Sequence, residues 1–594
     1  MKFDTAELAE LQEAFQKGTL HNVINLLEPL TSRSQSNSAH TTRICILRNH
    51  TIDNLVWFLR AGAVLRNLAV ECTLAPFDQL VPFILDPNST LHRENTDVVI
   101  LSLILEPFTN HDVNFTVPEV MERISEIIQA LRDNTTALLV LNTFLIPTMP
   151  TQGITTARNP ASLEQKIRQL NDWLLTQCQC NSRIFIVDFN QIEAQLGIML
   201  ARDLRLWYKA KYILTNKFLV KYAIEIIKII GALNGKSKKC LVLDADNCLW
   251  GGVIGEDGLN HIHLNPTDYP GNVFYEFQKQ LLALYNRGIL LCISSKNNEA
   301  DVWDVLDQHP HCLLKRHHIT ASRINWLEKS GHLVSLSIEL KLTLDSFVFV
   351  DDSSLECGLV SQNLKEVHVI QVPKHLWKYP EILIEEGLFD TLSGSAEDHT
   401  RTKMYQAASL RTTEARKFER PDDFLRTLNM IATIKHADTS QIPRIAQLTQ
   451  KTNQFNLTTH RYSETQIDKL ATSNHHEVIS LTVADRFGDF GLVGVAIIQF
   501  DRKVAEIDTL LLSCRILGRN LETVFLFECI NRLYRRGIAS VRGIYIPSSK
   551  NGQTEFFYRT SGFTLLPTET AQRHFQLTLV QPITTPYDYI EVRR

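Results

Sequence analysis

The spacing of apolar side chains predicts a helix at the start of the chain. Between residues 4 and about 28, apolar residues recur at near-helical intervals, at Leu8, Leu11, Phe15 and Leu20. A Ser/Thr-rich stretch then covers Thr31–Thr42, and a cluster of such residues is typical of a linker. We therefore predict that residues 1–42 form a short helical appendage and a linker.

From residue 43 to about 233, apolar runs of β-strand composition alternate with helical patterns. The four runs are Ile44–Leu47, Val98–Leu105, Ala137–Leu145 and Ile184–Val187. Strands that alternate with helices predict a parallel sheet with helices on its faces. We expect residues 43–233 to form one α/β domain of this kind.

Residues 236–389 have the same alternation, with three apolar runs that each end in polar residues. The runs are Cys240–Leu243, Ile289–Ile293 and Ser346–Val350. In an open α/β sheet, ligands bind beyond the carboxyl ends of the strands. The polar residues that follow these runs should therefore meet in one site of a second α/β domain.

A polar stretch at Ser393–Thr402 predicts a second linker, at residues 390–402. The remaining residues, 403–594, contain a predicted strand at Glu506–Leu512 and a predicted helix at Gly518–Arg532. The chain has 594 residues, and a single hydrophobic core stops growing at roughly 250–300 residues. We therefore expect several domains.

Composition narrows the classes of function. The chain has 61 basic and 65 acidic residues and a formal charge of −4, so it lacks the positive field that attracts nucleic acid. Its apolar runs are far shorter than the roughly 20 residues of a membrane-spanning helix, and its start has no apolar signal core. Eleven scattered cysteines predict neither a disulfide framework nor a metal site. We expect a cytoplasmic protein that binds neither nucleic acid nor a membrane.

Two carboxylates two residues apart, Asp244 and Asp246, directly follow the first apolar run of the second α/β domain. Such a pair alone is weak evidence, because it occurs by chance in many loops. Here it belongs to an ordered set in which polar residues follow three predicted strands and a lysine lies on a predicted helix. The other members are Ser295, Lys329, Asp351 and Asp352.

This set contains each part that phosphoryl transfer through an aspartyl-phosphate requires. Asp244 would attack phosphorus while Asp246 protonates the leaving oxygen. Ser295 and Lys329 would hold the phosphate. Asp244, Asp351 or Asp352, and the backbone carbonyl of Asp246 would bind a hard cation such as Mg²⁺. The residue types and their order in the chain agree with these roles.

Longer motifs around these residues resemble the FkbH-like branch of the haloacid-dehalogenase superfamily, its subfamily IIIC phosphatases. The resemblance implies a Rossmannoid parallel sheet for residues 236–389 and a domain similar to SGNH hydrolases for residues 43–233. Where such a hydrolase has its serine, this chain has Arg48–Thr51, so we expect a scaffold or docking role there. The motifs are Lys239–Gly258, Ser295–Glu299, Arg323–Trp326, Phe349–Asp352, Arg205–Lys211 and Gln450–Thr459.

The resemblance also implies a reaction. FkbH-like proteins load a glyceryl unit from bisphosphoglycerate onto the phosphopantetheine of an acyl carrier protein for polyketide or related biosynthesis, and they lose the remaining phosphate. The implied partners are an acyl carrier protein and a phosphorylated three-carbon acyl substrate, with Mg²⁺ as cofactor. Two alternatives stay open: a small-molecule phosphatase without acyl transfer, and a non-enzymatic docking scaffold.

The sequence departs from the superfamily at Cys248, where threonine is usual. In one interpretation the thiol fills the volume of the threonine as a buried cysteine. In the other it lies beside phosphate and metal, has a lowered pKa and carries the acyl group as a thioester. Trp250, which follows closely, is expected near the substrate.

The last domain resembles GNAT acyltransferases, which have an α+β fold. The loop that precedes its predicted helix matches the RxxGxG/A motif at Arg515, Gly518, Arg519 and Asn520. Exposed backbone amides at a helix start can hold a pyrophosphate, so the resemblance implies coenzyme A or phosphopantetheine as a ligand. Asn520 replaces the usual glycine or alanine, and the alternative is a binding module without chemistry of its own.

Overall fold

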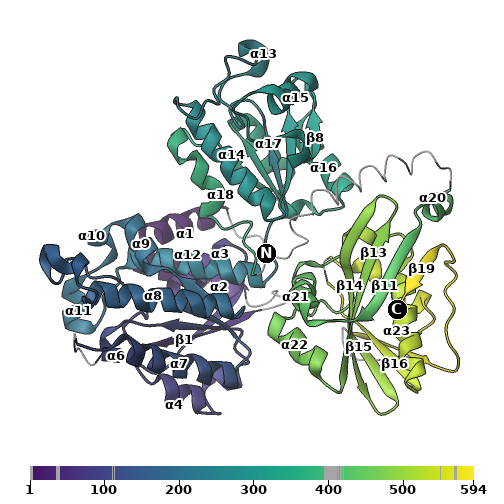
Figure 1. Ribbon diagram of the computed structural model, residues 1–594, viewed down its shortest axis with the longest axis horizontal. Coiled ribbons are helices and arrows are strands. Elements are labelled where there is room, and N and C mark those ends of the chain that lie inside the picture. Colours follow the sequence, from purple (N-terminus) through teal and green to yellow (C-terminus); the bar gives the residue numbers. More distant parts are fainter. Residues whose placement is uncertain are drawn as a thin grey trace. The chain divides into compact units, whose positions relative to one another are not determined.

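The computed structural model describes residues 5–34, 41–109, 112, 114–392, 411, 414, 418, 420–548, 550–567 and 572–594. It divides into two compact units, Met1–Asn234 and Gly235–Arg594. Figure 1 shows the helices and strands of both units, coloured along the sequence. Most of the two predicted linkers, residues 35–40 and 393–402, lies outside the described residues.

The first unit contains a five-stranded parallel sheet with the strand order β2-β1-β3-β4-β5. Four of these strands overlap the four predicted runs. β2 was not predicted, because it is an edge strand whose residues are only partly buried and so lacks a continuous apolar run. The strands are β1 (Thr42–Arg48), β2 (Val70–Leu74), β3 (Val98–Ser102), β4 (Leu138–Asn142) and β5 (Ile184–Val187).

Helices connect these strands, and the first two helices of the chain belong to the same unit. α1 and α2 pack against α3, with Phe15 of α1 in edge contact with Phe58 of α3. They are therefore part of this core, where the sequence indicated a separate appendage. The helices are α1 (Thr5–Lys17), α2 (Leu20–Ser34), α3 (Leu55–Leu65), α4 (Leu80–Leu85), α5 (Thr90–Arg93), α6 (Glu106–Thr109), α7 (Val117–Asn134), α8 (Leu163–Cys180), α9 (Phe189–Leu196), α10 (Ile198–Ala201), α11 (Leu204–Ala210) and α12 (Asn216–Leu233).

The second unit begins with another five-stranded parallel sheet, of order β10-β9-β6-β7-β8. The three predicted apolar runs correspond to β6, β7 and β9. These strands are neighbours in the sheet, in the order β9-β6-β7, so their carboxyl ends lie at one edge of the sheet. The strands are β6 (Cys240–Leu243), β7 (Leu290–Ser295), β8 (Ile319–Ile324), β9 (Phe347–Asp351) and β10 (His368–Gln371). The helices are α13 (Ile254–Asp257), α14 (Gly271–Asn286), α15 (Glu299–Gln308), α16 (Lys329–Leu340), α17 (Ser354–Asn363) and α18 (Ile382–Glu385).

Helices cover both faces of this sheet, which explains why β6 has no polar residue. Leu241 and Leu243 point into the core that includes Phe277 of α14. Cys240 and Val242 point into the core that includes Leu333 of α16. A strand buried on both faces is a continuous apolar run, and its first polar residue marks where the sheet ends.

The second sheet of this unit is mostly antiparallel, with the order β17-β18-β16-β15-β14-β13-β11-β19, and β12 also pairs with β15. The predicted helix starts three residues late, at Leu521, because Gly518 and Asn520 both have positive φ angles. The strands are β11 (Met430–His436), β12 (Phe455–Asn456), β13 (His476–Asp485), β14 (Gly488–Asp501), β15 (Val504–Leu512), β16 (Ser540–Tyr545), β17 (Thr564–Leu565), β18 (Arg573–Thr578) and β19 (Ile590–Arg593). The helices are α20 (Pro421–Thr427), α21 (Ile442–Lys451), α22 (Glu464–Thr472), α23 (Leu521–Arg535) and α24 (Phe557–Thr560).

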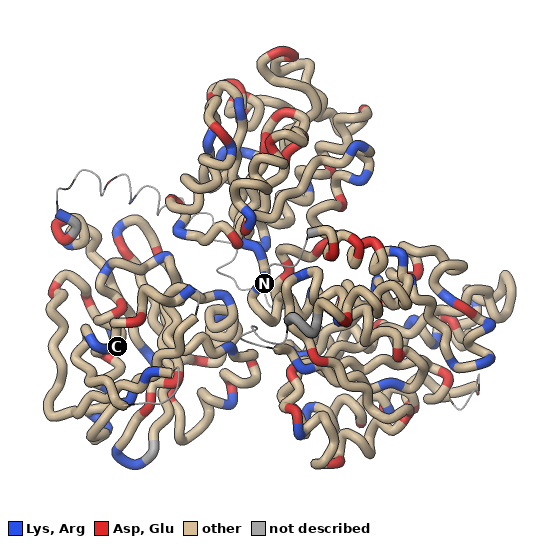
Figure 2. Tube along the Cα trace, turned by 180° about the vertical axis from the view of Figure 1, so that it is seen from behind, with Lys and Arg blue, Asp and Glu red and all other residues tan. Residues whose placement is uncertain are grey.

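Acidic and basic residues are interspersed over both units (Figure 2). In the part of the chain that the structure describes, no helix combines the length and the apolar character needed to cross a membrane. All eleven cysteines are free thiols.

Candidate phosphatase site

The polar residues at the carboxyl edge of the first sheet of the second unit form one cluster. Asp244 directly follows β6, Asp351 ends β9, and Lys329 is the first residue of α16. The ammonium of Lys329 lies 3.0 Å from Oδ1 of Asp244 and 2.6 Å from Oδ2 of Asp351. Burial alone would lower the pKa of Lys329, but the charges of the two carboxylates raise it above its usual value. Lys329 is therefore a buried cation between two acids.

Three carboxylates of this cluster could share a cation. One oxygen from each of Asp244, Asp351 and Asp352 lies within 4.8 Å of the others. Burial, and then the charge of Asp244, raises the pKa of Asp351 to about 6 and also raises that of Asp352. Oδ1 of Asp244 is buried and makes no well-directed hydrogen bond, despite its distance from Lys329. Crowded carboxylate oxygens of this kind fit a hard divalent cation.

The carboxylate of Asp246 is not in that group. Its Oδ1 accepts hydrogen bonds from Nε1 of Trp250 at 2.9 Å and from the backbone N–H of Ile254 at 3.0 Å. Its Oδ2 accepts from Nδ2 of Asn297 at 2.8 Å. Burial and the charge of Asp244 nevertheless raise the pKa of Asp246. Asp246 is thus held apart from the other acids and protonates more readily than an ordinary aspartate. Asp246 was also expected at the metal, but only its backbone carbonyl could contribute there, whereas Asp244, Asp351 and Asp352 offer carboxylate oxygens.

Two of these partners correct or extend the sequence analysis. Trp250 was expected near the substrate, but its side chain is fully buried, and its contact is with Asp246. Asn297 was not predicted, although it lies only two residues after Ser295, in the loop that follows β7; its side chain is buried. Only the folded loop shows that this amide reaches Asp246.

Ser295 is the last residue of β7 and is only 2% exposed. Its carbonyl oxygen accepts the backbone N–H of Asn325 at 3.1 Å. A second link joins the same segments, because the buried ring of His332 contacts Oγ of Ser294 at 3.0 Å and Oδ1 of Asn325 at 2.8 Å. The sequence gave no signal for His332. These contacts fix the loop that carries Ser295 against the start of α16.

Cys248 does not have the environment of a reactive thiol. Its side chain is fully buried, and Sγ lies 3.1 Å from the hydroxyl of Tyr379. Burial and the charge of Asp244 raise the pKa of Cys248 well above its usual value. An acyl-carrying cysteine needs exposure and a lowered pKa, so the structure contradicts the catalytic interpretation. Cys248 fills space in the core, as in the first interpretation.

The loop before α23 has internal partners for most of its predicted ligand groups. The backbone N–H of Gly518 donates to the carboxylate of Glu522 at 2.8 Å. The guanidinium of Arg519 lies 3.4 Å from a carboxylate oxygen of Asp485, and its side chain is buried. Asn520 donates to the hydroxyl of Tyr589 at 2.7 Å.

Asn520 has a φ of 65°, so it adopts the left-handed conformation that a glycine would supply. The replacement therefore leaves the turn intact. Arg515 lines a pocket together with Ser513 and Cys514.

The first unit contains a serine–histidine pair at the carboxyl edge of its sheet, which the sequence analysis did not find. Nε2 of His50 lies 3.1 Å from Oγ of Ser102. Both side chains are fully buried, and Nδ1 of His50 has no hydrogen-bond partner among the described residues. Burial lowers the pKa of His50 to about 3. The pair is closed to substrate and lacks an orienting carboxylate, which agrees with a structural role.

Two family models match the chain. Residues 43–231 match the model for the FkbH N-terminal domain, and residues 239–370 match the model for NLI interacting factor-like phosphatases. No curated protein shows significant similarity.

Among solved structures, the chain resembles the N-terminal part of the protein BF1531 from Bacteroides fragilis, which contains a phosphatase domain complexed with Mg. The identity is 26%, the TM-score is 0.57, and the match covers 62% of this chain and 99% of that chain. The ribosomal-protein-S18-alanine N-acetyltransferase from Escherichia coli matches with 17% identity and a TM-score of 0.21, over 25% of this chain and 93% of that chain. PaiA N-acetyltransferase from Thermoplasma acidophilum, in complex with coenzyme A, matches with 14% identity and a TM-score of 0.19, over 25% and 99%.

The two family models follow one another along the chain, and the phosphatase model includes Asp244, Asp246, Lys329 and Asp351. The chain therefore contains an FkbH N-terminal domain at residues 43–231 and, at residues 239–370, a phosphatase domain that matches the NLI interacting factor-like family.

Proposed function

We propose that the chain is a Mg²⁺-dependent phosphatase that acts on a phosphorylated three-carbon acyl group and passes this group to an acyl carrier protein. The observation that carries the phosphatase assignment is the position of Lys329, which is buried between Asp244 and Asp351. An ammonium at this place orients the nucleophile and compensates phosphate charge, as aspartyl-phosphate chemistry requires.

In the proposed mechanism, a free carboxylate oxygen of Asp244 attacks the phosphorus atom. A bond forms between this oxygen and phosphorus while the bond from phosphorus to the substrate oxygen breaks. Asp246 gives its proton to the leaving oxygen, which its raised pKa favours. Water then attacks the phosphoryl group on Asp244, Asp246 takes back a proton, and inorganic phosphate leaves.

Asp244, Asp351 and Asp352 would hold Mg²⁺, because one carboxylate oxygen of each lies within 4.8 Å of the others. Bound there, the ion supplies positive charge for the phosphoryl oxygens. Lys329 provides a second, fixed cation in the same place. Ser295, at the end of β7, would donate a hydrogen bond to the phosphate.

The acyl-transfer part of the proposal is supported by the FkbH N-terminal domain. Its test is mass analysis of a phosphopantetheinylated carrier protein after incubation with the enzyme, Mg²⁺ and bisphosphoglycerate. The proposal predicts a glyceryl adduct on the carrier together with release of phosphate. Phosphate release without an adduct would show a phosphatase that does not transfer the acyl group, and no phosphate release would refute both parts.

A further inference from the structure

The inner strand β15 of the last domain changes its partner on one edge partway along its length. Over Val504–Ile507 this edge pairs with β16 in the parallel direction, and the pairing ends there. Near the end of β15, at Leu511 and Leu512, the same edge pairs with β12 in the antiparallel direction. The other edge of β15 pairs with β14 from Val504 to Leu512. Two strands of the chain therefore divide one edge of β15 between them.

β12 and the residue after it are bonded on both sides. The backbone N–H of Leu457 donates to the carbonyl oxygen of Leu510 at 3.2 Å, and the carbonyl oxygen of Leu457 accepts the N–H of Ile546 at 2.8 Å. Nδ2 of Asn551 donates to the carbonyl oxygens of Asn456 and Ile546, both at 2.9 Å, and the side chain of Asn551 is fully buried. These bonds fix β12 between β15 and the segment that follows β16.

Side chains that follow β12 cover the short stretch of β15 between its two partners. This stretch consists of Asp508 and Thr509. Nδ1 of His460 lies 3.1 Å from Oδ1 of Asp508. The hydroxyls of Tyr462 and Thr509 donate to Oδ2 of the same carboxylate. Burial alone would raise the pKa of Asp508, but the hydrogen bonds from His460 and Tyr462 lower it. Both oxygens of this ionised carboxylate are therefore already bonded.

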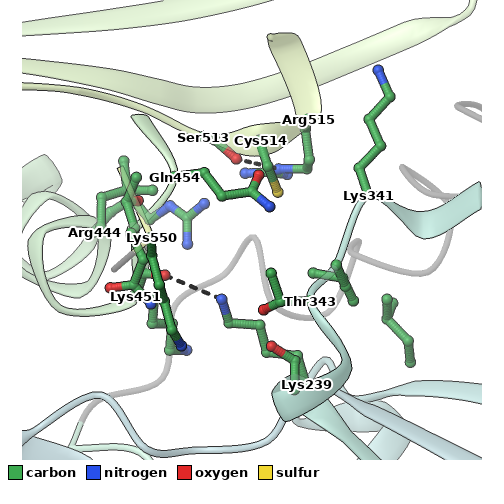
Figure 3. A pocket seen from close by; sticks show the side chains of 16 residues that line it. Lys239, Lys341, Thr343, Arg444, Lys451, Gln454, Ser513, Cys514, Arg515 and Lys550 are labelled. Carbon is green, nitrogen blue, oxygen red and sulfur yellow. Dashed lines mark hydrogen bonds between the residues drawn. The ribbon is translucent and has the colours of Figure 1, made fainter. Parts of the chain in front are cut away.

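The residues directly before β12 are anchored as well. The carbonyl oxygen of Lys451 accepts a hydrogen bond from Nζ of Lys239 at 3.1 Å, and Figure 3 draws this bond. Lys239 directly precedes β6 of the phosphatase body. Gln454 and Ser513, which adjoin the paired ends of β12 and β15, line the pocket in the same view. β12 is thus fixed at its start as well as along its length.

This closed edge bears on whether the domain can take an acyl donor of the coenzyme A type. A pyrophosphate held by the loop before α23 would lie at the carboxyl end of β15, because the loop follows that strand. The amide groups of a pantetheine arm would then need free backbone groups, which an extended chain finds at an open sheet edge. Here the chain's own backbone takes those positions on β15. Gly518, Arg519 and Asn520 of the loop also have partners within the domain.

We propose that β12 is a built-in strand at the place that an acyl-donor arm would need, so that the last domain takes neither coenzyme A nor a phosphopantetheine arm on β15. The role that remains for the domain is that of a binding module. A carrier protein that this chain loads would therefore present its arm away from β15. The proposal does not depend on the phosphatase mechanism, because its residues lie outside the phosphatase site.

Hydrogen exchange of the full chain, followed by peptide mass spectrometry, tests the proposal. The amides of Leu457 and Ile546 should exchange as slowly as those of β14, because all of them are bonded inside the sheet. Coenzyme A is the probe, since it carries both a pyrophosphate and a pantetheine arm. At concentrations up to about 1 mM, it should leave the exchange of residues 455–460 and 508–520 unchanged. A change in either segment on addition of coenzyme A, or rapid exchange at Leu457, would overturn the proposal.

Asn551→Ala removes the side chain that holds Asn456 and Ile546. Exchange of residues 455–458 should become about fivefold faster, the effect of losing roughly one hydrogen bond. Asn531→Ala is the matched control, because Asn531 bonds both backbone groups of Ile583 in another part of the domain. It should speed exchange near Ile583 and leave residues 455–458 unchanged, and thermal melting shows whether each variant is folded. A folded Asn551→Ala variant with unchanged exchange at 455–458 would contradict the fixed position of β12 and overturn the proposal.

Discussion

The indole N–H of Trp250 donates to Oδ1 of Asp246 across 2.9 Å, inside a core where the indole has no exposed surface. Trp250→Phe should keep most of the apolar contacts and remove this donor. Because the donor stabilises the carboxylate, its loss should raise the pKa of Asp246 further. We expect kcat for phosphate release to fall by about tenfold and the pH optimum to move upward. Steady-state kinetics between pH 5 and pH 9 would measure both changes, and an unchanged pH profile would contradict the role given to Trp250.

Asp244→Asn keeps the shape of the proposed nucleophile and removes its charge. Phosphate release should fall by at least about a thousandfold, because no covalent intermediate can form. Asp352→Asn is the informative comparison, since it removes a proposed metal ligand and leaves the nucleophile. High Mg²⁺ should restore part of the activity of Asp352→Asn and none of Asp244→Asn. Equal rescue of both variants would show that their roles are assigned wrongly.

Lys329→Met replaces the buried ammonium with an apolar chain of similar length. Asp244 and Asp351 then face each other uncompensated, and breaking a buried ion pair in this way costs about 3 kcal/mol. The metal-free variant should therefore unfold more easily than the unchanged protein. Mg²⁺ should stabilise the variant more than the unchanged chain, because the ion replaces the missing charge. Chemical unfolding with chelator and with Mg²⁺ compares the two effects.

Cys248 should be inert to alkylation in the native protein. Iodoacetamide at pH 8 should label Cys180, which is exposed, before it labels Cys248. Cys248→Thr should keep both phosphate release and carrier loading. Peptide mass spectrometry maps the labelled sites, and a glyceryl adduct found on Cys248 would contradict this assignment.

His50 should make the first unit sensitive to acid. Its pKa is about 3 in the folded protein and about 6.5 in an unfolded chain. Between these values the unfolded state binds more protons, so stability falls as the pH falls. From pH 7 to pH 4 the expected loss from this one group is about 3 kcal/mol. His50→Gln should remove that part of the pH dependence, which unfolding curves of the variant and the unchanged chain at both pH values would show.

The sequence was a good guide to the sheet centres and to the acids beside them. β6 is buried on both faces, so its apolar run and the aspartates that follow it are visible without a structure. Half-exposed strands such as β2, and β8 with its polar residues, lack that signal. The sequence also predicted that Lys329 and Asp244 belong to one site, and in the structure the ammonium lies 3.0 Å from Oδ1 of Asp244.

The partners of the acids could not be predicted in the same way. Asn297 and Trp250 donate hydrogen bonds to Asp246 because of the conformations of the loops after β6 and β7. The periodicity of apolar residues, which predicts helices and strands, does not predict the conformation of a loop. The choice between the two interpretations of Cys248 depends on whether its thiol is exposed. The residues next to Cys248 in the sequence do not determine this exposure. The structure shows it buried beneath Tyr379.

The buried ammonium of Lys329 sets the electrical balance of the phosphatase site. Asp244, Asp351 and Asp352 bring up to three negative charges around this single positive one, and burial together with the charge of Asp244 raises the pKa of Asp351 to about 6. When all three acids are ionised, the group has a net charge of −2 and repels a phosphate monoester, which is also an anion. One divalent cation cancels that negative charge. Binding should thus be ordered, with the cation entering before the substrate and product phosphate leaving before the cation.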